Sequence, residues 1–337
     1  MKRWLVYALG GGLGHLTRAL ALGRAAAQRG YHLTILCNSP MAASLLSDDC
    51  PKRIALPASL ELILLDPQAG RDDTAENVLR ILARRDFDLL VVDTFARGLG
   101  GELVATLPTI PQPKVWIHRN VSPRYVDQCD LLTFARHFSL VLVPGEDAPL
   151  AHLPLAFRTS PWTVCDFGDL LNRSDARQAF GIPVHDFLPM AVVVGTGRPD
   201  EVEAARLAAA TLYRRLAGRV HVRLATTRST GESFAVSVWP LMVLMRGIDL
   251  LVGAGGYNTV YEARQTGTPL IAVPQQRQYD VQSQRLSVEE SSPTWSAAVE
   301  RVTRWNFSKQ RASKRFENGN HAAVLQTASL LDDWALF

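Results

Sequence analysis

The feature that most constrains this chain is a strand, glycine turn and helix unit in its C-terminal third. The apolar run 248–252 is typical of a buried parallel strand. Gly255 and Gly256 then allow a sharp turn, and a helix is predicted from Asn258. Because a helix N-terminus presents unpaired N–H groups and a partial positive charge, it is suited to a diphosphate. Glu262 follows about one turn later, where a carboxylate can accept hydrogen bonds from ribose hydroxyls. The segment predicts a nucleotide diphosphate site, and a tightly packed helix entrance without a ligand is the alternative.

A second unit of the same kind begins the chain. Residues 4–9 read as a strand, 10–14 as a glycine-rich turn that ends at His15, and 16–29 as a helix that Gly30 ends. A triphosphatase phosphate loop needs Gly-Lys-Ser/Thr here, and a dinucleotide fingerprint needs a third glycine where His15 stands. The fingerprint also needs an acidic residue after the second strand, whereas 32–37 is followed by Asn38 and Ser39. Both of those motifs are therefore disfavoured.

Strand-like and helix-like patterns alternate along the chain, which predicts parallel sheets covered by helices. The prolines at 149, 154 and 161 interrupt this alternation and indicate a connection between two domains. The expected strands are 4–9, 32–37, 61–65, 89–92, 114–117 and 140–143 in the first part, and 190–194, 220–225, 248–252 and 270–273 in the second. The expected helices include 74–85, 173–180, 201–216 and 321–334.

Composition bounds the class of protein. A chain of 337 residues, 47% hydrophobic and 20% charged, suffices for two globular domains. The net charge of +4 is modest and no basic stripe is interleaved with aromatics, so nucleic acid is not an expected partner. No apolar run approaches the roughly 20 residues that span a bilayer. No signal peptide precedes residue 4, and the four cysteines (Cys37, Cys50, Cys129 and Cys165) have no metal-ligand spacing. We expect a cytoplasmic protein with reduced thiols, with peripheral membrane contact left open.

The two glycine turns together resemble those of the MurG-like glycosyltransferases, whose two-domain fold is called GT-B. The run 11–15, Gly-Gly-Leu-Gly-His, is similar to the family's N-terminal turn, and 255–262 matches its Gly, Thr and Glu pattern. Residues 266–274 resemble the family's Gly-x-Pro-x-x-x-x-Pro strand, and Asp280-Val281-Gln282 resembles its acidic-x-Gln motif. The resemblance implies an acceptor-side Rossmann-like domain at 1–160 and a nucleotide-sugar domain at 161–320, facing each other across a cleft. Residues 321–337 would pack back on the first domain.

The motifs give a set of expected site residues. Asp280 and Gln282 are assigned to the donor sugar by resemblance alone. His118 and Arg119 follow the strand 114–117 and are assigned to an acceptor. Arg18 lies one turn beyond His15 and is grouped with them, with an anionic acceptor or a phosphate as its expected ligand. The expected nucleotide-sugar contacts are Gly12, Gly14, Gly195, Thr196, Gly255, Gly256, Asn258, Thr259, Glu262, Asp280 and Gln282.

The chemistry implied is sugar transfer from a nucleotide diphosphate sugar, with a UDP-sugar expected, to an unknown acceptor. His15 is the candidate base because an imidazole titrates near neutral pH. Asp93 ends the strand 89–92 and is the candidate that orients it, since the carboxyl ends of parallel strands meet at one edge of a sheet. Because His15 would deprotonate the acceptor, inversion at the anomeric carbon is expected. No Asp-x-Asp motif is present, so neither a metal nor a further cofactor is expected, and the helix N-terminus would stabilise the leaving diphosphate.

Two alternatives remain open from the sequence. The run 14–18, Gly-His-Leu-Thr-Arg, also resembles the nucleotide-sugar hydrolases of the pseudaminic acid pathway, in which water replaces the acceptor. A non-catalytic nucleotide-binding subunit is the second alternative. Release of free sugar without an acceptor would identify the hydrolase, and binding without turnover would identify the subunit.

Overall fold

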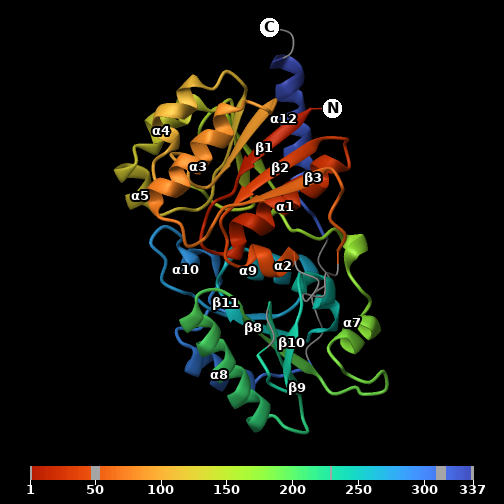
Figure 1. Cartoon of the computed structure of the whole chain (residues 1–337). Coiled ribbons are helices and arrows are strands. Elements are labelled where there is room, and N and C mark those ends of the chain that lie inside the picture. The colour runs from red at the N-terminus through yellow and green to blue at the C-terminus, as the bar shows by residue number, and fades with distance from the viewer. Residues whose placement is uncertain (1, 47–53, 228–229, 309–315, 335–337) are drawn as a thin grey trace.

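The computed structural model of the chain describes residues 2–46, 54–227, 230–308 and 316–334. Cys50 and residues 335–337 of the expected terminal helix lie outside the described residues. The chain forms two α/β domains, one above the other in Figure 1, that meet at the level of α2, α9 and α10. Both sheets are parallel, with strand orders β3-β2-β1-β4-β5-β6-β7 and β10-β9-β8-β11-β12. The predicted pair of Rossmann-like parallel-sheet domains is confirmed.

The first sheet is built from apolar runs that are buried on both faces, as parallel strands between helices require. Its strands are β1 (Arg3–Tyr7), β2 (His32–Cys37), β3 (Leu60–Leu64), β4 (Leu89–Asp93), β5 (Lys114–Ile117), β6 (Leu140–Pro144) and β7 (Ala156–Thr159). Its helices are α1 (Leu13–Ala27), α2 (Ala42–Leu46), α3 (Arg71–Ala83), α4 (Leu103–Thr106), α5 (Pro123–Gln128) and α6 (Leu131–Phe134), with 3-10 turns η1 (Leu107–Thr109) and η2 (Ala135–His137).

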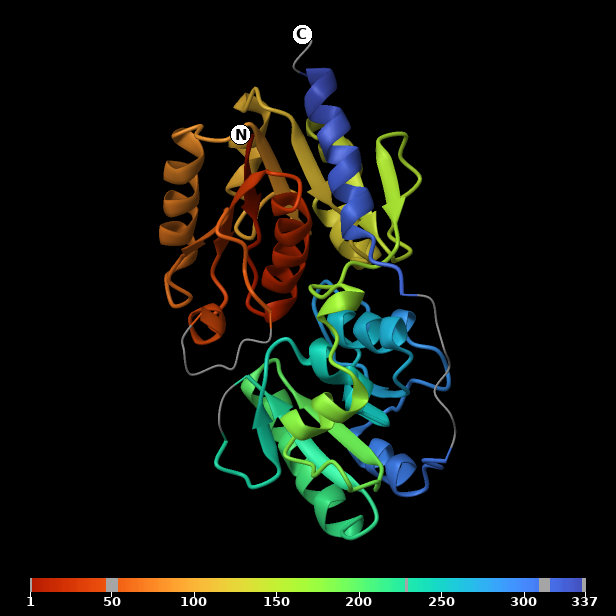
Figure 2. The ribbon, with the colours of Figure 1, turned by 90° about the vertical axis from the view of Figure 1, so that its right-hand side faces the viewer.

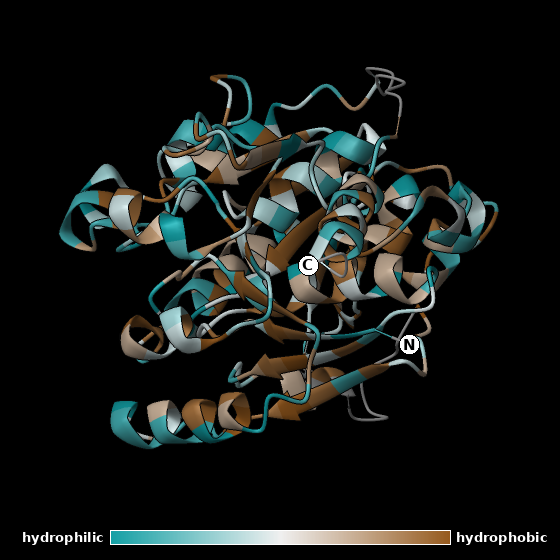
Figure 3. Cartoon of the chain, turned by 90° about the horizontal axis from the view of Figure 1, so that it is seen from above, coloured by the Kyte–Doolittle hydropathy of each residue, from teal (hydrophilic) through white to brown (hydrophobic). Residues whose placement is uncertain are grey.

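The second domain repeats the pattern with a smaller sheet. Its strands are β8 (Met190–Gly195), β9 (His221–Thr226), β10 (Ala235–Ser237), β11 (Leu250–Ala254) and β12 (Leu270–Val273). Its helices are α7 (Arg173–Ala179), α8 (Pro199–Arg215), α9 (Tyr257–Thr266), α10 (Gln282–Arg285) and α11 (Trp295–Thr303), with η3 (Phe167–Asp169) and η4 (Leu241–Gly247). The most hydrophobic segments are the strands in the interior, while the outer helices carry hydrophilic residues (Figure 3). No helix among the described ranges is long and apolar enough to cross a membrane.

The last helix, α12 (Asn320–Trp334), returns to the first domain and lies along α1 and β7 (Figure 2). Asn320 is buried at its start, and its Nδ2 donates to the Ala21 carbonyl of α1 (3.0 Å). Gly319 makes this approach possible, because a Cβ there would stand 1.9 Å from the Ser160 carbonyl oxygen. The chain passes between the domains twice, and the two connecting segments lie side by side near residues 160 and 319.

Strand register brings the ends of central strands together. Tyr7 pairs with Val92, and Asp93 pairs with Ile117. The turns that follow β1, β4 and β5 therefore emerge at one edge of the first sheet, and this edge faces the second domain (Figure 1).

Candidate active site between the two domains

The glycine turn after β1 holds His15 close to the backbone. Asn38, at the end of β2, accepts a hydrogen bond from the Gly10 N–H (2.8 Å) and so fixes the start of the turn. The His15 ring lies directly over Gly10, since a Cβ on that residue would be 2.2 Å from His15 Cδ2. Only glycine permits this approach. Gly10 is thus a site residue that the sequence motif does not single out.

His15 and Arg18, one helical turn apart on α1, both bind Asp93 at the end of β4. His15 Nδ1 donates to Asp93 Oδ2 (2.7 Å), and Arg18 Nε and Nη2 donate to the two carboxylate oxygens (2.8 and 2.7 Å). Burial alone would raise the pKa of Asp93, but the charge of Arg18 and the hydrogen bonds from His15 and Arg18 outweigh it and hold that pKa far below its usual value. Asp93 therefore stays ionised and keeps the proton of His15 on Nδ1, which leaves Nε2 as the acceptor nitrogen.

Thr94 supports this cluster from a strained backbone. Its φ is 63°, in the left-handed region that a β-branched residue rarely enters. Its Oγ1 accepts from Arg18 Nη2 (3.1 Å), and its carbonyl accepts from the indole of Trp116 (3.1 Å). Such outliers cluster at functional sites, but no sequence pattern marks Thr94 in advance.

On the opposite side of the cleft, α9 presents an N-terminus without a side-chain cap. Gly256 is its N-cap residue in an extended conformation, and among the described residues no side-chain hydrogen bond caps the helix. Gly253 lets the strand and helix pack closely, because a Cβ there would stand 3.1 Å from the methyl group of Thr259. The predicted strand, turn and helix unit is present, and its free N–H donors can bind an anion.

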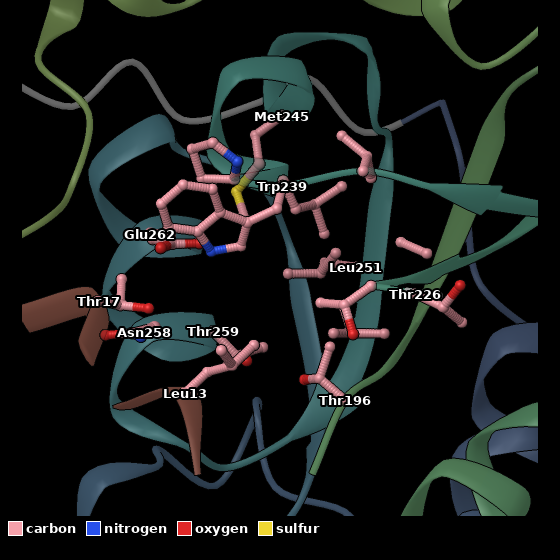
Figure 4. A pocket seen from close by; sticks show the side chains of 16 residues that line it. Leu13, Thr17, Thr196, Thr226, Trp239, Met245, Leu251, Asn258, Thr259 and Glu262 are labelled. Atoms are coloured by element: carbon pink, nitrogen blue, oxygen red, sulfur yellow. The ribbon is translucent and has the colours of Figure 1, made fainter. Parts of the chain in front are cut away.

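A small pocket opens beside this N-terminus (Figure 4). It measures about 90 Å³, and residues of both domains line it, among them Leu13, Thr17, Thr196, Trp239, Asn258 and Glu262. Glu262 is 8% exposed, and its carboxylate accepts no hydrogen bond from the described residues. Burial raises the pKa of Glu262 to about 8. An unpaired carboxyl beside the Trp239 indole is poised to bind hydroxyl groups of a ligand.

The pocket joins a larger cleft of about 540 Å³, since Leu13, Thr196, Asn258 and Thr259 line both. His15 stands on the first-domain wall of the cleft, stacked on Phe95 with ring centroids 5.3 Å apart. Tyr279 of the second domain meets Phe95 edge to face (5.8 Å). The cleft therefore has an apolar, aromatic wall next to His15.

A buried ion network ties the domains together beneath the cleft. Glu146, after β6, accepts from Arg119 Nε and from Arg285 Nε of the second domain (2.6 Å each). Arg285 also donates to Asp280 Oδ1 (2.7 Å) and to the Gly255 carbonyl (2.7 Å). Burial alone would raise the pKa of Glu146, but the two arginines outweigh it and lower that pKa. Asp280 and Arg119 are thus held in an interdomain network.

Most of the expected site residues converge on the cleft, and three do not. His118 is fully buried, its Nε2 accepts from the Leu150 N–H (3.1 Å), and burial lowers its pKa to about 3. The placement of His118 on the cleft wall is therefore corrected: it packs inside the first domain, because its side chain turns from the strand end toward Leu150 and Trp116. Gly195 and Gly255 lie behind the wall and shape its turns. The residues that line the cleft or the small pocket are Gly12, Gly14, His15, Arg18, Arg119, Thr196, Gly256, Asn258, Thr259, Glu262, Asp280 and Gln282, with Asp93 directly behind His15.

The sequence reasoning missed several residues of the site. Trp239 and Met245 come from the segment between β10 and β11, where no motif marks them. Phe95 and Tyr279 meet only across the domain boundary. Among the described residues, no cluster of His, Cys, Asp and Glu side chains is arranged to hold a metal ion.

No family model and no curated protein sequence matches the chain. Solved structures do. The kitacinnamycin glycotransferase is similar over 98% of this chain and 99% of its own (14% identity, TM-score 0.60). SnogD, a glycosyltransferase from Streptomyces nogalater, is similar over 98% and 100% (15% identity, TM-score 0.58), and the spinosyn rhamnosyltransferase SpnG over 99% and 95% (20% identity, TM-score 0.56). SpnG has also been solved with thymidine diphosphate and with spinosyn aglycone. With two parallel-sheet domains and neighbours of this kind, the chain has the GT-B fold.

Proposed function

We propose that the protein is a glycosyltransferase that moves a sugar from a nucleotide diphosphate sugar to an acceptor hydroxyl. The observation that carries the proposal is the unpaired, buried carboxyl of Glu262 beside the uncapped N-terminus of α9, across the cleft from the His15–Asp93 pair. A ribose and a diphosphate fit the first two features, and an acceptor hydroxyl fits the third. The assignment to the MurG-like branch rests on the sequence motifs and is part of the proposal.

The donor would lie mainly on the second domain. Trp239 offers an aromatic face to a base, Glu262 accepts from the ribose, and the N–H groups of Asn258 and Thr259 face the diphosphate. We propose a uridine donor. SpnG binds thymidine diphosphate, so thymidine nucleotides are the direct competitor in the test.

His15 would act as the base. Its Nε2 takes the proton of the acceptor hydroxyl as that oxygen attacks C1 of the donor sugar, and the bond between C1 and the diphosphate oxygen breaks with inversion. The imidazolium that forms is stabilised by ionised Asp93, as the 2.7 Å contact provides. The N–H groups at the start of α9 stabilise the charge that develops on the leaving diphosphate, which needs no metal ion.

The acceptor would occupy the first-domain side of the cleft, in the region 1–160. Met41, Phe95, Val121 and Tyr279 line the cleft near His15, and this apolar wall favours an acceptor with an apolar face next to its hydroxyl group. SpnG, a similar structure, has been solved with spinosyn aglycone. Residency in the cytoplasm with peripheral membrane contact stays a prediction.

Thermal shift with a panel of nucleotides tests the donor side. We expect stabilisation by UDP and its sugars that exceeds stabilisation by thymidine diphosphate and ADP, and loss of that effect in Glu262→Ala. His15→Ala keeps the nucleotide shift but lowers turnover roughly 10²- to 10⁴-fold with a competent acceptor. If no nucleotide raised the melting temperature of the wild-type protein, the proposal would be disproved.

Incubation with a UDP-sugar alone tests the hydrolase. Rapid stoichiometric release of free sugar without an acceptor would replace transfer by hydrolysis, with the same His15 acting on water. Nucleotide binding with no turnover over a broad acceptor panel would leave the binding-subunit alternative.

A further inference from the structure

Two arginines of the first domain reach the cleft with unused donors. Arg18 is 1% exposed, and three of its contacts go to Asp93 and Thr94, but Nη1 has no hydrogen-bond partner among the described residues. Arg119 is 8% exposed and gives Nε to Glu146, while its Nη2 likewise lacks a hydrogen bond and lies 3.9 Å from Asp280 Oδ1. A buried N–H of a charged group without a partner is costly, so these two groups on the cleft wall are candidates to bind a ligand.

The two guanidinium groups converge on the same place in the second domain. Arg119 lies over the Tyr257 ring (4.3 Å to its centroid), and Arg18 approaches the same ring (5.7 Å). Tyr257 is the first residue of α9 and is itself fixed, because its hydroxyl donates to the Pro144 carbonyl and accepts from the Trp162 N–H. Both guanidinium groups therefore lie close to the side chain of the first residue of α9, and Arg18, Arg119, Gly256 and Asn258 line one cleft.

The surrounding charges favour an anion with several oxygens. Asp93 faces Arg18, and Glu146 and Asp280 face Arg119 and Arg285, so each arginine already has a carboxylate on one edge. Arg18 Nη1 and Arg119 Nη2 have no hydrogen-bond partner among the described residues, and both arginines line the same cleft as Gly256 and Asn258 at the start of α9. A ligand that satisfies donors from three directions needs more acceptor oxygens than one carboxylate has, and a diphosphate has them.

We propose that Arg18 and Arg119 bind the diphosphate of the donor from the first-domain side, so that the anion is gripped by both domains at once. The inference rests on the proposed function. It assigns Arg119 to the diphosphate instead of an acceptor, and it decides for Arg18 between the anionic acceptor and the phosphate that the sequence left open. Arg18 then has two tasks: it holds Asp93 through Nε and Nη2, and it neutralises the leaving group through Nη1.

The test compares uridine, UDP and inorganic pyrophosphate by isothermal titration calorimetry on the full chain. Arg18→Lys and Arg119→Lys keep the charge facing Asp93 and Glu146 but lose the guanidinium donor. We expect each to weaken UDP and pyrophosphate binding roughly 10- to 100-fold, the worth of one charged hydrogen bond, and to leave uridine binding unchanged. Unchanged melting temperatures confirm that the variants fold.

Arg285→Lys is the matched control, because Arg285 binds the same Glu146 but does not line the cleft. It is expected to keep the ratio of UDP to uridine affinity. If Arg18→Lys and Arg119→Lys also keep that ratio, the diphosphate assignment is wrong, and a loss confined to an anionic acceptor would assign them to that substrate instead. Failure of the proposed function is a different result: wild-type protein with no Glu262-dependent affinity for UDP at all.

Discussion

At the scale of single residues, the buried carboxyl of Glu262 lowers the stability of the protein once it ionises. Its carboxyl is buried, has no hydrogen-bond partner among the described residues and has a pKa of about 8. A glutamate in an unfolded chain has a pKa of roughly 4.3. Such a group contributes stability that is fully present below the unfolded pKa and is lost as the pH rises through the folded one. An apolar side chain at this position could fill the same space without the cost of burying an ionisable group.

Glu262→Gln is therefore expected to stabilise the ligand-free protein at high pH. The two proteins should unfold alike near pH 4, and the advantage of the variant should grow by up to about 1.4 kcal/mol per pH unit towards pH 8. Urea denaturation across this range measures it. Glu203→Gln, which alters an exposed carboxylate, is the control. A pH-independent difference would contradict the placement of Glu262.

Gly10 is expected to affect His15 only sterically, by leaving room for the imidazole ring. A methyl group at Gly10 overlaps the imidazole, so Gly10→Ala must displace the ring from Asp93. We expect turnover to fall about 100-fold, as for a reacting group misplaced by about 1 Å, while UDP affinity stays within twofold. Gly11→Ala, with open space around its Cβ position, is the control, and equal loss in both would refute the steric explanation.

At the scale of elements, buried apolar runs predicted the central strands well. Residues 114–117 and 270–273 match β5 and β12, and 32–37 matches β2. The edge strands β7 and β10 were missed, since one contains Arg158 and the other has three residues, and neither carries a continuous apolar signal. The strand-end argument predicted that His15 and Asp93 meet, and they do. It misplaced His118, because a residue at a strand end can turn inward, and it missed Trp239, because contacts across domains leave no local pattern.

The return of α12 depends on the close approach at Gly319. Gly319→Ala should push its backbone away from Ser160 and weaken the docking of α12 on α1. Overpacking of this kind is expected to lower stability by about 1 to 3 kcal/mol. Limited proteolysis should cleave near 319 first, whereas nucleotide affinity is retained because α9 is untouched. Wild-type protease resistance would show that the contact is dispensable.

At the scale of the whole molecule, Glu146 couples the domains. It is the shared acceptor for Arg119 and Arg285, and Tyr261 Oη adds a hydrogen bond to the Gly145 carbonyl (2.8 Å). Glu146→Gln removes the carboxylate that Arg119 and Arg285 share and leaves Asp280 as their remaining counter-ion. Breaking a buried pair costs up to about 3 to 5 kcal/mol. We expect calorimetry to show a lower transition that splits into two as the domains uncouple. Glu203→Gln should unfold like the wild type, and an unaltered single transition in Glu146→Gln would remove Glu146 from this role.

The pocket beside Glu262 is far smaller than the roughly 300 Å³ typical of sites for molecules of nucleoside size. Leu13 and Thr17 of α1 form part of its wall, against Trp239 of the other domain. If a nucleoside binds at Glu262 as proposed, these two walls would have to separate to admit it. We expect the release of a nucleotide to be no faster than this separation.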